Sequence, residues 1–81
     1  MLLNDAFVHQ QAAALAARLR REAGDKPEAQ IEHAFLLVLQ RLPQERELQA
    51  AQQLIRAQPD NTGLESFCRG LLNLNESIYV D

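Results

Sequence analysis

The stretch LESFCRGLLNLNESIY, residues 64–79, decides the fold class of this chain. Its apolar residues recur at helical steps, a spacing that gathers side chains on one face of an α-helix. That face carries Leu64, Phe67, Cys68, Leu71, Leu72, Asn75, Ile78 and Tyr79. The stretch therefore predicts an amphipathic helix over about residues 63–79.

Three earlier segments repeat this spacing, over about residues 5–23, 27–41 and 44–58. Their expected buried stripes are Val8, Ala12, Leu15 and Leu19 in the first, Ile31, Ala34, Phe35, Val38, Leu39 and Leu42 in the second, and Leu48, Ala51, Leu54 and Ile55 in the third. No segment shows the period of two that a strand needs. Because short loops force neighbouring helices to run antiparallel, the sequence predicts one all-α domain over residues 1–81, a compact antiparallel four-helix domain.

Glycine, proline and acidic residues mark the ends of the first two helices. Gly24 is placed to take a left-handed conformation after the first helix. Asp25 and Glu28 have the spacing of an acidic capping box for the second helix. Pro27 suits the first turn of that helix, and Pro43 is expected to stop it.

The longest loop is expected in the sequence QPDNTG, residues 58–63. Gly63 is expected to form part of its turn. Thr62 and Glu65 have the spacing of a capping box, so they are expected to open the last helix.

Composition limits the classes of function. The 81 residues are 47% apolar and 23% charged, which is typical of a small globular domain with a modest core. Eight basic and eleven acidic residues give a net charge of −3, which argues against a nucleic-acid binder because such proteins usually carry a basic excess. No run approaches the roughly 20 apolar residues that span a bilayer, and the start lacks a signal-peptide pattern, so we expect no membrane insertion.

The reactive side chains offer no catalytic residue, no metal site and no cofactor site. Cys68 is the only cysteine, and its place on the apolar face predicts a core residue rather than a nucleophile. His9 and His33 lack the spacing of metal ligands, and His9 is expected to pair with Asp5. Tyr79 is expected to cover the end of the bundle rather than to act as a catalytic phenol.

The arginines are expected to be structural or solvated. The sequence RLRR at residues 18–21 has acidic neighbours, which predicts a solvated helix end rather than a phosphate site. Arg41 admits two interpretations, an anion-binding residue or an arginine that holds the corner between the second and third helices. We favour the corner, with Glu47, Glu76 or a carbonyl oxygen as the acceptor.

Asn75 lies on the apolar face of the last helix, where an unpartnered amide costs about 1–3 kcal/mol. It should therefore bond to the end of the second helix, or else Asn73 or Asn75 caps a break in its own helix. With Arg41, Glu47 and Glu76, these asparagines are predicted to form a structural polar clip rather than a ligand site. In a denaturant melt, Asn75→Ala is expected to lower the free energy of unfolding by about 1–3 kcal/mol, and Asn73→Ala by less.

Three segments resemble one known family. The opening fits the pattern N-x-x-F-V-x-x-Q-A-x-x-L-A through Asn4, Phe7, Val8, Gln11, Ala12, Leu15 and Ala16. The centre, AFLLVLQRLPQERELQ, is similar to A-x-x-L-x-L-G-R-x-P-x-x-x-E-L, and FCRGLLNLNESIYVD resembles endings of the type LCQALLNLNEFLYVD. The chain thus resembles Domain of Unknown Function family 1553, also called planctomycete-specific domain one.

The resemblance implies a context rather than a chemistry. Such segments close large, exported bacterial proteins that often carry a cytochrome-c-like haem domain near the front, and no activity is assigned to the segment itself. The chain departs from the pattern at Gln40, where Gly is favoured, at Gln44, where a Ser, Thr or Asp cap is common, and at Ser77, where Phe is usual. These departures are expected to weaken a loop, a helix cap and a core contact.

Two hypotheses for function follow. In the first, the chain is a non-enzymatic accessory module that binds upstream domains of its parent protein or another protein, with self-association left open. In the second, it completes the active site of an upstream catalytic or haem-containing domain, with Arg41 and Glu76 as polar contacts. A helix-turn-helix DNA binder is the least supported interpretation, because the last helix carries only one arginine, Arg69.

An exposed apolar patch would mark the interface that the first hypothesis requires. The apolar residues that fall off the main stripes are Leu2, Leu3, Leu36, Leu74 and Val80. A contiguous patch among them is the expected sign of an interaction module.

Overall fold

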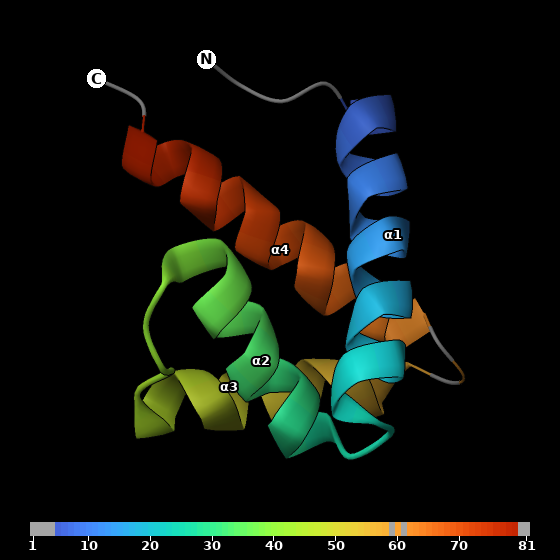
Figure 1. Cartoon of the computed structure of the whole chain (residues 1–81), viewed down its shortest axis with the longest axis vertical. Helices are drawn as coiled ribbons and strands as arrows, with labels where there is room; N and C mark the ends of the chain where they lie inside the picture. The colour runs from blue at the N-terminus through green and yellow to red at the C-terminus, as the bar shows by residue number, and fades with distance from the viewer. Residues whose placement is uncertain (1–4, 59, 61, 80–81) are drawn as a thin grey trace.

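The computed structural model describes the backbone of residues 5–58, 60 and 62–79, and the side chains of residues 6–58, 60 and 62–75. The described chain forms four helices and no strand: α1 Asp5–Ala23, α2 Pro27–Leu39, α3 Glu45–Ala57 and α4 Thr62–Tyr79. Successive helices turn back on one another, and α3 lies across the end of the domain beneath α2 (Figure 1). The all-α four-helix prediction is confirmed.

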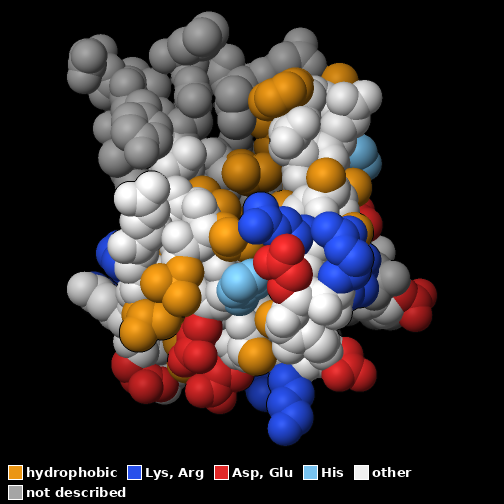
Figure 2. Space-filling model, in the orientation of Figure 1, with side chains coloured by type: hydrophobic (Ala, Val, Ile, Leu, Met, Phe, Trp, Pro, Cys, Tyr) orange, Lys and Arg blue, Asp and Glu red, His pale blue; other side chains and the backbone are white. Residues whose placement is uncertain are grey.

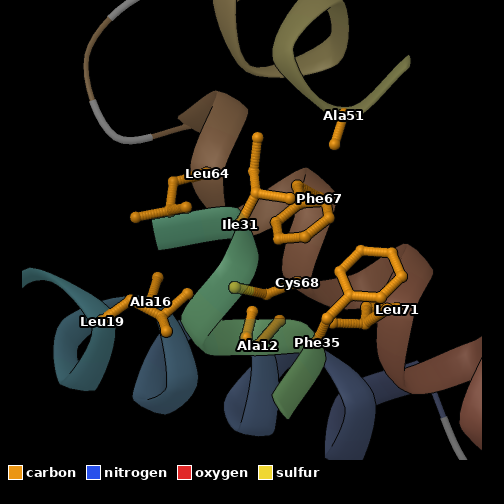
Figure 3. Packing of buried hydrophobic residues seen from close by; sticks show 11 residues of the cluster. Ala12, Ala16, Leu19, Ile31, Phe35, Ala51, Leu64, Phe67, Cys68 and Leu71 are labelled. Carbon is orange, nitrogen blue, oxygen red and sulfur yellow. The ribbon is translucent and has the colours of Figure 1, made fainter. Parts of the chain in front are cut away.

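Helix α4 is the centre of the packing. It contacts each of the other three helices, whereas α1 and α3 do not pack against one another. Its residues Leu64, Phe67, Cys68 and Leu71 are all 5% exposed or less. Figure 3 shows these side chains converging with Ile31 and with residues of α1. The sequence stretch with the strongest helical pattern therefore supplies the middle of the core.

On the α1 side of the core, small residues allow close packing. Ala12 and Ala16 are at most 1% exposed, and Leu19 is fully buried. Cys68 is also fully buried, as predicted, and burial raises the pKa of its thiol to about 12. A thiol in this state is not a nucleophile at neutral pH.

Helix α2 ends earlier than predicted. It stops at Leu39, and Gln40 follows in the left-handed conformation with φ 58° and ψ 34°. Pro43 lies four residues beyond that end, so it does not stop the helix. The prediction that Leu42 belongs to the buried stripe is wrong: Leu42 follows the helix and is 59% exposed.

The connection between α1 and α2 shows one prediction confirmed and one wrong. Gly24 has φ +81°, the left-handed conformation expected of it. The acidic capping box is wrong, because Lys26 rather than Asp25 precedes the helix and no side chain caps it. Pro27 is the first residue of α2, as predicted, and the Gln30 side chain donates to the Gly24 carbonyl at 2.7 Å. That bond satisfies a carbonyl at the end of α1.

Gly63 was predicted to form a turn, but it lies within α4 and is buried. A Cβ atom added there would collide with the Ile55 carbonyl oxygen and would lie 2.9 Å from Ile55 Cα. Glycine is therefore needed because α3 and α4 approach closely at this point. Thr62 is likewise helical rather than a preceding cap, and Asn61 lies outside the described residues.

Candidate docking groove

An apolar groove of about 260 Å³ lies between α3 and α4. Its lining consists of Phe35 from α2, Glu47, Ala50, Ala51 and Leu54 from α3, and Phe67, Gly70, Leu71 and Leu74 from α4. Leu54 and Leu74 are 39% and 44% exposed, whereas Phe35 and Phe67 are at most 5% exposed. The edge of the groove thus exposes two leucines, while the aromatic core residues of its lining stay buried.

The same spacing on two helices builds the groove. Residues 47, 50, 51 and 54 of α3 follow steps of three, one and three, and so do residues 67, 70, 71 and 74 of α4. This spacing places each set on one helix face. Ala50 and Gly70 are both exposed, and a Cβ atom added at Gly70 would meet nothing within 4 Å. Small residues therefore keep the groove open.

A bidentate ion pair lies at the α2–α3 corner, beside the groove. Arg41 Nη1 and Nη2 donate to the two carboxylate oxygens of Glu47, at 2.8 and 2.9 Å. Arg41 Nη1 also donates to the Leu42 carbonyl at 3.2 Å. The geometry places Arg41 at the corner predicted for it, with Glu47 as the main acceptor.

The Glu47 carboxylate also completes the start of α3. The backbone N–H of Gln44, the residue before the helix, donates to Glu47 Oε1 at 2.8 Å. These bonds from Arg41 and Gln44 lower the pKa of Glu47 to about 2, and Glu47 raises the pKa of Arg41 in turn. The helix start is therefore capped by Glu47, although Gln44 replaces the usual short polar residue.

Arg41 also contacts the aromatic part of the core. Its Cζ atom lies 5.4 Å from the centre of the Phe35 ring, within the range of a cation–π contact. The Phe35 and Phe67 rings are 6.3 Å apart with 25° between their planes, and Figure 3 shows them side by side. Arg41 therefore contacts two residues of the groove lining, Phe35 and Glu47.

The remaining members of the predicted clip are only partly placed. Asn73 is exposed and Asn75 is half-buried on α4. The side chains of Glu76, Ser77 and Tyr79 lie outside the described residues. Because α4 runs unbroken from Thr62 to Tyr79, the predicted break capped by Asn73 or Asn75 is wrong. The bond of Asn75 to the end of α2 stays a prediction, and the structure brings together Arg41 and Glu47 of the predicted set.

A second polar cluster joins α1 to α2. Glu22 Oε2 accepts from Arg18 Nε at 3.0 Å, and Glu22 Oε1 lies 2.7 Å from His33 Nε2. The hydrogen bond with His33 lowers the pKa of Glu22 the most, and the hydrogen bond with Arg18 lowers it further. Figure 2 shows acidic, basic and histidine side chains adjoining on this face. His33 thus has a structural partner, while the predicted His9 partner, the Asp5 side chain, lies outside the described residues.

The RLRR sequence is only partly solvated. Arg18 and Arg21 are exposed, as predicted, but Arg20 is half-buried. Its Nη2 atom is buried without a hydrogen-bond partner. Among the described side chains, no group of three or more His, Cys, Asp and Glu residues is placed to hold a metal ion.

The exposed apolar residues differ from the predicted patch. Leu36 is 48% exposed and Leu74 is 44% exposed, as expected, while Leu2, Leu3 and Val80 lie outside the described residues. Sequence reasoning missed three further exposed apolar residues, Phe7, Leu42 and Leu54. The thin apolar stripe of the third helix was the available signal for Leu54. None of the described helices is long and apolar enough to cross a membrane.

Comparison with known proteins identifies the family. The family described as "PSD1: Protein of unknown function (DUF1553)" matches residues 1–55, which is more than half of the chain. The chain therefore belongs to this family, and the match includes the opening and central motifs. The chain matches no curated protein and no solved structure.

Proposed function

We propose that this chain is a non-enzymatic interaction module that binds an amphipathic helix of a larger parent protein in the groove between α3 and α4. One observation carries the proposal: Leu54 and Leu74, which line the apolar groove, are 39% and 44% exposed. A small domain gains stability when such apolar surface is covered. A partner that covers the groove would therefore stabilise the domain.

The chemistry of the lining supports an uncharged, apolar occupant. Of the described residues that line the groove, Glu47 alone is charged, and its carboxylate already accepts bonds from Arg41 and Gln44. A charged side chain buried here would lack a partner, which is costly. The complementary surface is therefore the apolar face of a helix.

The shape of the groove supports a helix in particular. Two helices with matched spacing form its walls, and Ala50, Ala51 and Gly70 leave room for a third backbone to approach. Helix-in-groove recognition uses apolar anchors at about i, i+4 and i+7. The family resemblance implies a larger parent protein, and a helix in the same chain would bind at a high effective concentration even in a small groove.

Titration calorimetry of this chain into the remainder of the parent protein, expressed without it, tests the proposal. Wild type should bind saturably, and Leu54→Arg or Leu74→Arg should weaken binding about tenfold or more, since each places a charge in the groove. Leu36→Arg is the matched control, because Leu36 is 48% exposed, close to the value for Leu74, but does not line the groove. Absence of binding, or equal loss in the control, would overturn the proposal. Self-association of wild type would identify a second copy as the occupant instead.

The alternative function, completion of an upstream active site, would use Arg41 as a polar contact. Both terminal nitrogens of Arg41 already donate within the domain, which supports the structural role. Arg41→Ala discriminates between the two functions. If the chain is an interaction module, the variant should lose a small amount of stability in a denaturant melt, because the pair is partly exposed, and the parent protein should stay active. If the chain completes an active site, the variant should stay folded and the parent protein should be inactive.

A further inference from the structure

We propose that the Arg41–Glu47 ion pair is a positioning element of the groove: it fixes the Phe35 ring and so sets the shape of the site that the partner helix enters. This inference rests on the proposed function for its purpose. Its geometric part, the placement of Phe35, stands on the contacts themselves.

A continuous chain of contacts crosses the end of the groove. Glu47 on α3 is held by the two terminal nitrogens of Arg41, at 2.8 and 2.9 Å. The Arg41 guanidinium contacts the Phe35 ring, and Phe35 contacts Phe67 on α4. Three of these residues, Phe35, Glu47 and Phe67, line the groove. The ion pair therefore links the α3 wall to the aromatic wall.

Both members of the pair are held firmly enough to fix a ring. Glu47 accepts a third hydrogen bond from the Gln44 backbone, so its carboxylate is set by the start of α3. Arg41 follows the left-handed residue Gln40 and donates to its neighbour Leu42. A bidentate pair also fixes the plane of the guanidinium, because its donors form a rigid fork. That plane determines how the guanidinium meets the Phe35 ring.

Stability alone accounts poorly for this arrangement. The Arg41 and Glu47 side chains are 44% and 28% exposed, and ion pairs at such exposure contribute little to stability. Beyond the Arg41–Glu47 bonds, the contact of the pair that reaches the groove is the one with the Phe35 ring, which lines it. The bonds with Leu42 and Gln44 lie outside the groove lining. The main effect of the pair is therefore expected in the geometry of the groove.

Methyl NMR of the full chain, with toluene as a neutral apolar probe, tests the inference. Arg41→Lys keeps the charge but loses the planar fork, and Glu47→Gln keeps the shape but loses the charge. Each should shift the methyl resonances of Ala51 and Leu71 and weaken toluene binding about three- to fivefold. Arg46→Lys and Glu45→Gln are the controls on the same helix turn. They should change neither the methyl resonances of Ala51 and Leu71 nor the affinity for toluene.

The two readouts separate this inference from the proposed function. The positioning role would be overturned if wild type binds toluene, both variants bind it as tightly as wild type, and their methyl resonances do not move. If wild type binds no toluene but the variants still shift the methyl resonances, the result would support the positioning role and count against the docking groove.

Discussion

The two sides of α4 are built differently. Toward α1, the centre of the packing is closed: Ala12, Ala16, Leu19 and Cys68 are all at most 1% exposed. A hollow of about 260 Å³ also borders α1, but the polar side chains of Gln11 and Arg18 form part of its lining. Toward α3, the same helix borders a groove of about 260 Å³, and the leucines at its edge stay substantially exposed. On the closed side, the small residues Ala12 and Ala16 allow α1 to pack closely against α4. On the open side, the small residues Ala50 and Gly70 leave space between α3 and α4.

This difference distinguishes the side of α4 that stabilises the fold from the side that remains available for binding. Closed packing on the α1 side buries apolar area, which stabilises the fold. The open side exposes apolar surface that the described part of the chain does not cover. Within this small domain, the α1 side therefore serves folding and the α3 side is the candidate for recognition.

The largest expected effect contrasts a leucine from each side. Leu19 is fully buried, so Leu19→Ala should lower the free energy of unfolding by about 2–5 kcal/mol, through lost burial and the cavity left behind. Leu54 is 39% exposed, so Leu54→Ala should cost less than about 1 kcal/mol. Urea denaturation followed by circular dichroism measures both. Equal losses would show that the groove side is as important for folding as the α1 side.

The two glycines of α4 give a second comparison between close packing and open space. Gly63→Ala should destabilise by about 1–3 kcal/mol, because its Cβ atom would collide with the Ile55 backbone. Gly70→Ala should stabilise the free domain by about 0.5–1 kcal/mol, since alanine is the better helix former and its Cβ atom meets nothing within 4 Å. Thermal unfolding of the pair tests this. A stable Gly63→Ala variant would mean that α3 and α4 can separate there at little cost.

The end of α2 offers a smaller, stabilising change. Gln40 has φ 58°, a conformation that glycine adopts without strain, so Gln40→Gly should raise the free energy of unfolding by about 0.5–1 kcal/mol. Gln53→Gly, in the middle of α3, is the matched control and should lower it by about 1 kcal/mol. If both variants lose stability equally in urea, the left-handed conformation of residue 40 is not a source of strain.

The smallest expected effect is a dependence on acid. The folded-state pKa of Glu47 is about 2, below the ordinary value of 4.5, so the native state binds this proton less readily than the unfolded state does. The stabilisation is therefore fully present above pH 4.5 and is lost as the pH falls toward 2. Because the pair is partly exposed, it amounts to about 1 kcal/mol or less. Urea melts of wild type and Glu47→Gln at several pH values should converge at low pH, and a constant difference would contradict this assignment.

The helices were predictable because their evidence is local. The apolar spacing of residues 64–79 identifies α4 without knowledge of its neighbours, and Gly24 marks the end of α1. Gly63 was misassigned to a turn because its role depends on the close approach of Ile55, which is eight residues away in sequence. The end of α2 was missed because Gln40 is an unusual residue for a left-handed conformation. The family pattern favours Gly at this position because glycine adopts the left-handed conformation without strain.

The candidate site was predicted only in its local part. Arg41 and Glu47 flank one corner, so the charged fork and its acceptor could be paired from sequence. The groove could not be predicted, because it depends on how α3 and α4 pack. Leu54 was assigned to a buried stripe, yet α3 leaves it 39% exposed. Helical spacing indicates which face a residue occupies, but not whether a neighbouring helix covers it.

Amide hydrogen exchange of this chain, alone and with the remainder of the parent protein, tests whether the open side of α4 binds the partner. We expect slower exchange in residues 50–54 of α3 and 70–74 of α4 when the partner is bound, with the α1 side unchanged. Protection confined to α1 and α2, or no added protection at saturating partner, would contradict the assignment of the open side of α4 to recognition.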